Sequence, residues 1–169
     1  MIETIRAQSI SRRAVILAAL LMSVPSVTES IAGSPLATKR FETLRSGSVA
    51  AFKPGTVTDI IFVAHWCGSP CEKEMGEVRR ILGKHRRAGF RVILVGVSVR
   101  QSKEQFGKWA SRFRLGAPLV HDASGAIEKE FGAELLPWHV VIGPRGDLLY
   151  KGAEVPSDAQ IQRFLGRRP

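Results

Sequence analysis

The chain has 169 residues, 44% of them hydrophobic, a formal net charge of +10 and two cysteines. This length suits one domain with a core of its own, and the composition excludes a disordered chain and a polytopic membrane protein. The positive charge is scattered and accompanies no nucleic-acid-binding motif, so we expect a basic solvated surface and no nucleic-acid partner.

Residues 1–32 have the pattern of an export signal. Arg6, Arg12 and Arg13 precede the apolar run 14–24, which is shorter than the roughly 20 residues of a membrane-spanning helix. Small residues surround a cleavage site after Ala32, and the arginine pair fits either a twin-arginine or an ordinary secretory leader. We predict a periplasmic domain over 33–169, or, if the leader is not cleaved, a domain anchored to the inner membrane.

From residue 59 onward the chain alternates strand and helix patterns. The apolar run 59–64 predicts a strand, and apolar residues spaced by three and four predict a helix over 72–87 that ends at Gly89. The β-branched run 92–99 predicts a strand buried on both faces. Residues 33–58 are less informative and indicate only a short strand near 48–52.

Two capping boxes mark helix starts in the second half, Ser102 with Gln105 and Ser157 with Gln160. The order of elements predicts an α/β fold in which a central mixed sheet carries helices on both faces. The helix after Ser102 has the apolar face Phe106, Trp109, Ala110 and Phe113. The other expected elements are strands over 119–121, 138–142 and 148–151 and a brief helix ending at 131.

Both cysteines lie in the stretch "HWCGSPC", residues 65–71. They could form a structural disulfide, bind a metal ion or act as a reversible redox couple. The surrounding segment "FVAHWCGSPCEKEMGEV" resembles the active site of TlpA/ResA-type thioredoxin-like proteins (redoxins), which are exported thiol–disulfide oxidoreductases. The similarity continues through 92–113 and 118–152, about two-thirds of the chain. This chain departs from the family by placing three residues, not two, between its cysteines, and we expect that to alter the reduction potential.

The resemblance implies a thioredoxin-like fold and a redox-active disulfide between Cys67 and Cys71. Cys67 would end a strand and attack the partner, whereas Cys71 would lie in the first helical turn, after Pro70 at the first helical position, and resolve the mixed disulfide. The positive end of a helix lowers the pKa of a cysteine held there and so favours the thiolate. Trp66 would shield the pair, unless it is simply a core residue.

Further roles also come from the resemblance. Pro137 would be the cis-proline beside the disulfide, and Leu136 would face the cysteines and give an apolar docking surface. Glu74 would take the proton of Cys71, as a partly buried carboxyl with a raised pKa, or would only be a solvated residue of the first turn. Ile61 stands where thioredoxin has a buried Asp. We therefore expect no proton transfer through such an Asp, and this favours Glu74 as the proton acceptor.

Metal binding is the main alternative. Two thiolates and an imidazole suit Cu(I), so Cys67, Cys71 and His139 could form the site of an SCO-like copper chaperone. However, His139 follows Pro137 directly, where the sequence fits the cis-proline position instead. A charged His65 would stabilise the Cys67 thiolate. We expect His121 to be a strand residue and His85 an ordinary core or boundary residue.

Two other interpretations are weaker. Peroxiredoxin chemistry needs Thr or Ser three residues before the nucleophile, where Ala64 stands. A purely structural disulfide across so short a loop would stabilise the fold only modestly. We therefore predict a monomeric enzyme without cofactor, copper being the alternative. Its expected partners are protein thiols and disulfides, with apocytochromes and oxidase assembly factors as candidates, and it would meet the membrane only through an uncleaved leader.

Overall fold

The computed structural model describes residues 38–97 and 99–167. The predicted leader, residues 1–32, and the first residues of the predicted domain lie outside these ranges. Within them, no helix combines the length and the apolar character that crossing a membrane requires.

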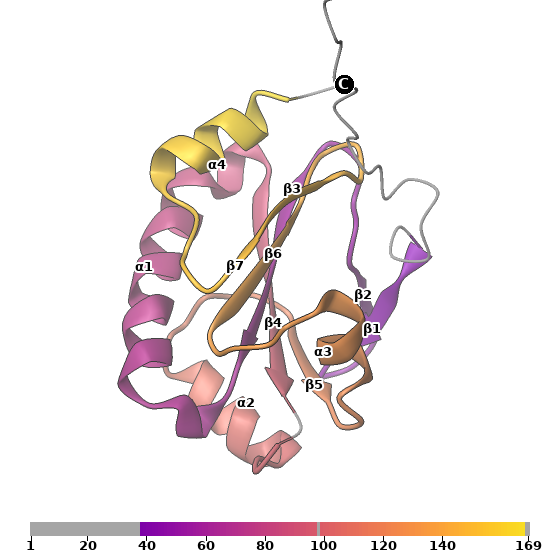
Figure 1. Ribbon diagram of the computed structural model, residues 1–169, viewed down its shortest axis with the longest axis vertical. Helices are drawn as coiled ribbons and strands as arrows, with labels where there is room; N and C mark the ends of the chain where they lie inside the picture. The colour runs from indigo at the N-terminus through magenta and orange to yellow at the C-terminus, as the bar shows by residue number, and fades with distance from the viewer. Residues whose placement is uncertain (1–37, 98, 168–169) are drawn as a thin grey trace, which may run out of the picture.

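A five-stranded mixed sheet forms the centre of the domain (Figure 1). The strands lie in the order β5-β4-β3-β6-β7, in which β3, β4 and β5 are parallel and β6 runs antiparallel to both β3 and β7. Every residue of β3 is buried, as expected for the middle strand of a sheet covered on both faces. The strands are β3 (Val57–Val63), β4 (Phe90–Val97), β5 (Leu119–Asp122), β6 (Trp138–Ile142) and β7 (Leu148–Gly152).

Helices cover both faces of the sheet, which confirms the predicted α/β architecture. One face carries α1 (Ser69–His85), α2 (Lys103–Ser111) and α4 (Asp158–Leu165). The other carries α3 (Ala126–Phe131) and the hairpin of β1 (Arg40–Glu42) and β2 (Ser48–Ala50), at the right in Figure 1. Side chains alternate along a strand, so Ile61 packs towards α1 while Phe62 packs towards α3.

The boundaries of most elements differ from the prediction by one to three residues, and three of these differences affect particular side chains. Helix α1 begins at Ser69, three residues early, so Pro70 is its second residue and not its first. Strand β4 ends at Val97, which leaves Val99 outside the sheet with 52% of its surface exposed. Phe113 lies beyond the end of α2, although its ring still packs edge-on against Trp109, with centroids 4.8 Å apart.

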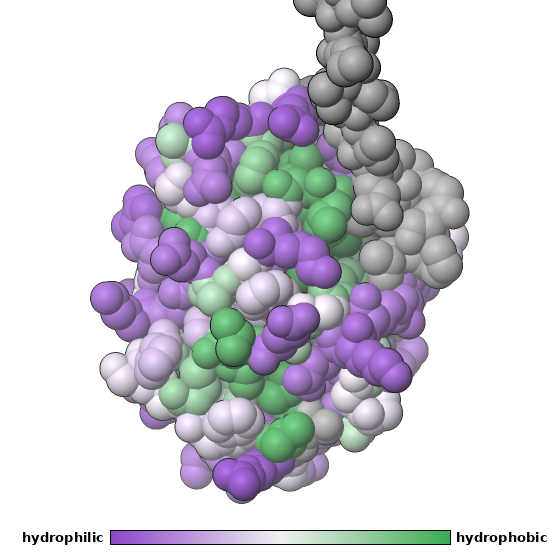
Figure 2. Space-filling view, viewed as in Figure 1, coloured by the Kyte–Doolittle hydropathy of each residue, from purple (hydrophilic) through white to green (hydrophobic). Residues whose placement is uncertain are grey.

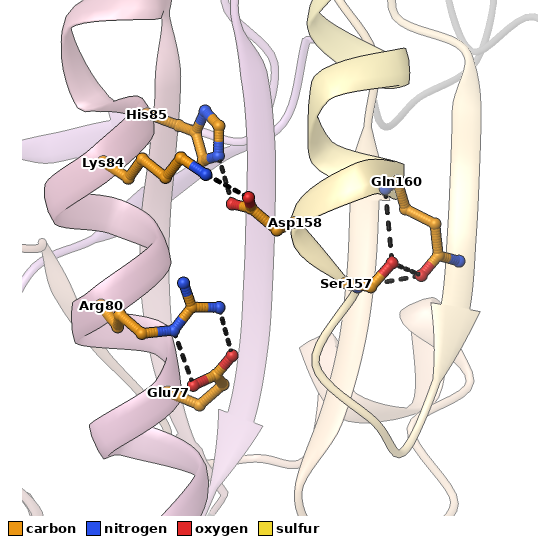
Figure 3. Close-up of polar contacts among 7 residues, drawn as sticks. All are labelled: Glu77, Arg80, Lys84, His85, Ser157, Asp158 and Gln160. Carbon is orange, nitrogen blue, oxygen red and sulfur yellow. Dashed lines mark hydrogen bonds and ion pairs between the residues drawn. The ribbon is translucent and has the colours of Figure 1, made fainter.

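The last helix is held against α1 by an ion-pair cluster. Asp158, the first residue of α4, accepts hydrogen bonds from Lys84 and, at 2.6 Å, from Nε2 of His85 (Figure 3). The predicted capping boxes are present at both α2 and α4. On the face drawn in Figure 2, hydrophilic side chains cover most of the surface and hydrophobic ones form separate patches.

Candidate active site

A disulfide joins Cys67 and Cys71 where β3 passes into α1. Cys67 ends the short 3-10 helix η3 (His65–Cys67), and Cys71 is the third residue of α1, with 5.8 Å between the two Cα atoms. Cys71 is fully buried, whereas Cys67 is half-buried. Cys67 is therefore the sulfur that another molecule can reach.

The longer spacing between the cysteines is accommodated at Gly68, outside the helix. Gly68 has a φ of +70° and a ψ of −142°, a conformation open mainly to glycine, and occupies the N-cap position of α1. Its carbonyl accepts the first hydrogen bond of the helix, from the amide of Glu72 at 3.1 Å. Cys71 lies in the first turn of α1, where the amides lack partners within the helix, and this is the electrostatic setting in which a thiolate is stabilised.

The predicted cis peptide bond is present between Leu136 and Pro137. Pro137 is buried, and the carbonyl oxygen of Leu136 lies 3.8 Å from Sγ of Cys67. A disulfide sulfur carries no hydrogen, so this is a contact in the oxidised protein, but a Cys67 thiol could donate to the same oxygen. Leu136 therefore lies beside Cys67, and its role in docking a partner stays a prediction.

A groove of about 440 Å³ opens beside Cys67. Three of the four large hydrophobic side chains exposed in the described ranges line it: Trp66 (45% exposed), Val99 (52%) and Leu135 (61%). Trp66 donates a hydrogen bond from Nε1 to the carbonyl of Val99. Because nearly half of its surface is exposed, the alternative of a core tryptophan is wrong. Leu136 completes the apolar lining, and the carboxylates Glu128 and Glu134 line the groove as well.

Gln101, in the segment between β4 and α2, supports the cysteine loop, and no sequence motif marks it. Its side chain is buried; Oε1 accepts the backbone amide of His65 at 3.0 Å, and Nε2 donates to the carbonyl of Val97. Nδ1 of His65 lies 3.3 Å from the same Oε1, and Nε2 of His121 lies 3.3 Å from the backbone carbonyl of Gln101. The two histidines therefore contact Gln101, and no hydrogen bond joins His65 to Cys67 in this oxidised state.

Three ionisable side chains form a hydrogen-bonded chain that runs from β3 through β6 to α1. Nδ1 of His139 lies 2.9 Å from Oδ2 of Asp59, and Nε2 of His139 lies 2.9 Å from Oε1 of Glu74. Asp59 and His139 are almost completely buried, and 18% of the Glu74 side chain is exposed. Burial by itself would lower the pKa of His139, but the Asp59 carboxylate and then Glu74 outweigh it and raise this pKa to about 9.

This cluster corrects the expectation that a buried carboxylate is absent. Ile61 does occupy the position considered, but Asp59, two residues earlier, points to the same face of β3 and is buried. The run 59–64 predicts an apolar strand, although its first residue is this aspartate. The signal for a buried polar cluster was the presence of two ionisable residues in strands that are otherwise apolar, Asp59 in β3 and His139 in β6.

The arrangement counts against the copper alternative. Both ring nitrogens of His139 face carboxylates, which leaves neither directed at the cysteine sulfurs. Within residues 38–97 and 99–167, no three His, Cys, Asp or Glu side chains are grouped as a metal site. His85 is a buried residue paired with Asp158, and His121 lies in β5, both as predicted.

Solved structures of similar fold come from several organisms. A thiol:disulfide interchange protein of the thioredoxin family from Chlorobium tepidum matches with a TM-score of 0.65 and 16% identity, over 77% of this chain and 94% of its own. A secreted disulfide oxidoreductase from Mycobacterium tuberculosis matches with a TM-score of 0.64 and 14% identity, over 79% and 98%. At these identities the matches establish the fold, which is thioredoxin-like.

The curated sequence relatives agree with the resemblance to ResA-type proteins. "Thiol-disulfide oxidoreductase ResA" from Geobacillus kaustophilus is 26% identical over 104 residues, 62% of this chain and 58% of that protein. The chain spans about half the length of the curated relatives that it matches. The model of the AhpC/TSA family matches residues 38–151, most of the described domain. The chain therefore belongs to the AhpC/TSA family.

Proposed function

We propose that this protein is an exported thiol–disulfide oxidoreductase that exchanges disulfides with other proteins through Cys67 and Cys71. The observation that carries the proposal is the contrast between the two sulfurs. Cys67 is half-exposed at a groove beside the carbonyl of Leu136, while Cys71 is buried behind it at the start of α1. The names of the ResA relatives support the same activity.

The exchange has two steps when the reduced protein meets a partner disulfide. The Cys67 thiolate attacks one partner sulfur, forming a mixed disulfide and releasing the other partner sulfur as a thiolate. Cys71 then loses its proton and attacks Cys67, so that the Cys67–Cys71 bond forms and the second partner sulfur leaves. Two electrons pass to the partner, no organic cofactor or metal is needed, and oxidation of a partner dithiol runs the same steps in reverse.

Glu74 is the group best placed to take the proton of Cys71. It stands three residues after Cys71, on the same side of α1, and its side chain is turned inward to His139. A carboxylate that retains some contact with water can pass the proton on to solvent. The Glu74 side chain would thus connect a fully buried thiol to the surface.

The side chains that line the groove indicate which kind of partner segment would bind there. Its exposed apolar lining of Trp66, Val99 and Leu135 suits an extended apolar segment that flanks a partner cysteine. Pro137 and the Leu136 carbonyl would orient that segment beside Cys67. We place the protein in the periplasm as a monomer, with apocytochromes and oxidase assembly factors among its candidate partners.

The test combines a redox titration with two cysteine variants. The purified domain is equilibrated with glutathione or dithiothreitol buffers, and its reduction potential shows whether it reduces or oxidises partners. Reduction of insulin disulfides measures turnover. We expect Cys67→Ser and Cys71→Ser each to abolish turnover while leaving the fold intact. A Cys67→Ser variant that keeps the activity would refute the proposal.

A further inference from the structure

We propose that His139, oriented by Asp59, is a positioning residue that turns Glu74 towards Cys71 and so speeds the resolving step of disulfide exchange. This inference rests on the proposed function and adds to it two residues that lie outside the cysteine motif. Three observations support it: the direction of the imidazole, the inward turn of Glu74 and the burial of Cys71.

The imidazole has a single orientation. Both carboxylate oxygens of Asp59 lie within hydrogen-bond distance of Nδ1, at 2.9 and 3.2 Å. Asp59 comes from β3 and His139 from β6, so neighbouring strands of the central sheet hold the two groups. With Nδ1 bound to Asp59, Nε2 must point away from the sheet and towards α1.

The inward turn of Glu74 depends on that nitrogen. A glutamate near the start of a helix normally extends into solvent, where a flexible side chain keeps its conformational entropy. Here Nε2 of His139 lies 2.9 Å from Oε1 of Glu74, and only 18% of the Glu74 side chain is exposed. The hydrogen bond occupies one oxygen and leaves the other free for a proton.

Burial explains why the resolving step needs this help. Cys71 has no exposed surface, so water cannot readily take its proton, whereas Cys67 is half-exposed. His139 donates to Glu74 through Nε2, and the raised pKa of His139 means that the donor stays protonated at neutral pH. When Cys71 attacks Cys67, its proton moves to Glu74 and then to solvent.

The other titratable side chain near the cluster is Tyr150 on β7, next to β6. Burial raises its pKa, and the charges of Asp59 and Glu74 add to the rise. The phenol donates to the backbone carbonyl of Glu154 at 3.0 Å, so its proton is already engaged elsewhere. Tyr150 thus affects the field at the cluster without belonging to the hydrogen-bonded chain.

The two steps can be resolved with Ellman's reagent, which releases a coloured thiolate at each. Attack by Cys67 on the reagent gives a first, concentration-dependent phase. Attack by Cys71 on Cys67 gives a second, unimolecular phase. We expect His139→Gln to slow the second phase by about tenfold, which is less than the roughly 100- to 10,000-fold that a complete general base contributes, because the variant keeps Glu74 and loses only its positioning. The first phase should change by less than about twofold, because Cys67 does not depend on Glu74.

A double variant separates positioning from simple structural support. If His139 acts through Glu74, then Glu74→Gln with His139→Gln is no slower than Glu74→Gln alone, and both single variants shift the pH profile of the second phase alike. His85→Gln is the matched control, since His85 is also buried and paired with an aspartate but lies at the far end of α1. It should leave both phases unchanged.

Loss of folding does not prevent the test. His139→Gln leaves Asp59 buried without its partner, and this loss could prevent the variant from folding. The double variant Asp59→Val with His139→Val removes both polar groups together, and we expect it to show the same slow second phase. An unchanged second phase in a folded His139 variant would overturn the inference, as would effects of Glu74 and His139 that multiply. Absence of the first phase in the unmodified protein would instead refute the proposed function.

Discussion

Asp59 and His139 lie diagonally across the pairing of β3 with β6: His139 is opposite Ile61, and Asp59 is opposite Val141. This register brings the Asp59 carboxylate within 2.9 Å of Nδ1, although the two residues are 80 positions apart in the chain. Diagonal neighbours on one face of an antiparallel pair are close enough for long side chains to meet. The contact therefore follows from the strand register and from no local sequence motif.

The oxidised protein should become less stable as the pH rises, because His139 loses its proton. The pKa of His139 is about 9 in the folded protein and 6.5 when unperturbed, so between these values the folded state binds more protons than the unfolded state. The stabilisation is complete below pH 6.5 and is lost as the pH rises through 9, by at most about 3 kcal/mol. Urea unfolding from pH 6 to 10 would measure this change. A slope that persists in a folded Asp59→Val, His139→Val variant would show that another group is responsible.

Replacing Cys71 should trap the intermediate. Cys71→Ser leaves the attacking Cys67 without a resolving thiol, so mixed disulfides with partner proteins should accumulate. Non-reducing electrophoresis followed by mass spectrometry would detect them and identify the partners. Cys67→Ser is the control, because the remaining Cys71 is fully buried. Equal trapping by both variants would contradict the assigned order of attack.

Gly68 should tolerate a side chain poorly. Alanine at this position has space, since nothing lies within 4 Å of its Cβ, but the φ of +70° with a ψ of −142° is unfavourable for it. We expect Gly68→Ala to cost about 1–3 kcal/mol of stability in the oxidised protein. Gly76→Ala, in the middle of α1 and equally free of contacts, should instead stabilise by about 0.5–1 kcal/mol. Denaturant unfolding of both variants gives the comparison, and a neutral Gly68→Ala would be contrary to the expected backbone strain.

Trp66 should matter for protein substrates and not for small ones. Trp66→Ala removes an exposed indole from the groove, and we expect it to slow insulin reduction by five- to tenfold, equivalent to roughly 1 kcal/mol. Its first-phase rate with Ellman's reagent should hardly change. Leu148→Ala is the control, since Leu148 is also exposed, at 37%, but does not line the groove. A similar loss in both variants would exclude a specific role for the groove.

Asp158 should stabilise the docking of α4 on α1 over most of the pH range. Hydrogen bonds from Lys84, and then from His85, lower the pKa of Asp158 to about 2. The contribution is therefore present above pH 3.8 and disappears as the pH falls through 2. Asp158→Asn should lower the melting temperature at pH 7. Glu77→Gln, which removes an exposed pair with Arg80 (Figure 3), should have a smaller effect. Equal decreases in melting temperature would mean that the contact between α4 and α1 stabilises the protein no more than an exposed ion pair does.

Much of the fold follows from local patterns. The capping boxes at Ser102 and Ser157 were predictable because both partners of each box lie within four residues of one another. The buried strands were predictable from continuous apolar runs, and β6 matches its expected range of Trp138–Ile142. Predictions failed by a few residues at element ends, as for Ser69 and Val99, where backbone geometry and exposure decide the boundary.

The candidate site also combines features that follow from local sequence with features that depend on packing. The cysteine motif, the strand and helix around it and, through family resemblance, the cis-proline at Pro137 were predictable because short contiguous stretches encode them. Three features became visible only in the folded protein: the exposure of Trp66, the deeper burial of Cys71 than of Cys67, and the contacts that join Asp59, His139 and Glu74. Those relationships depend on strand register and on how α1 lies over the sheet, and both arise from packing between residues far apart in the chain.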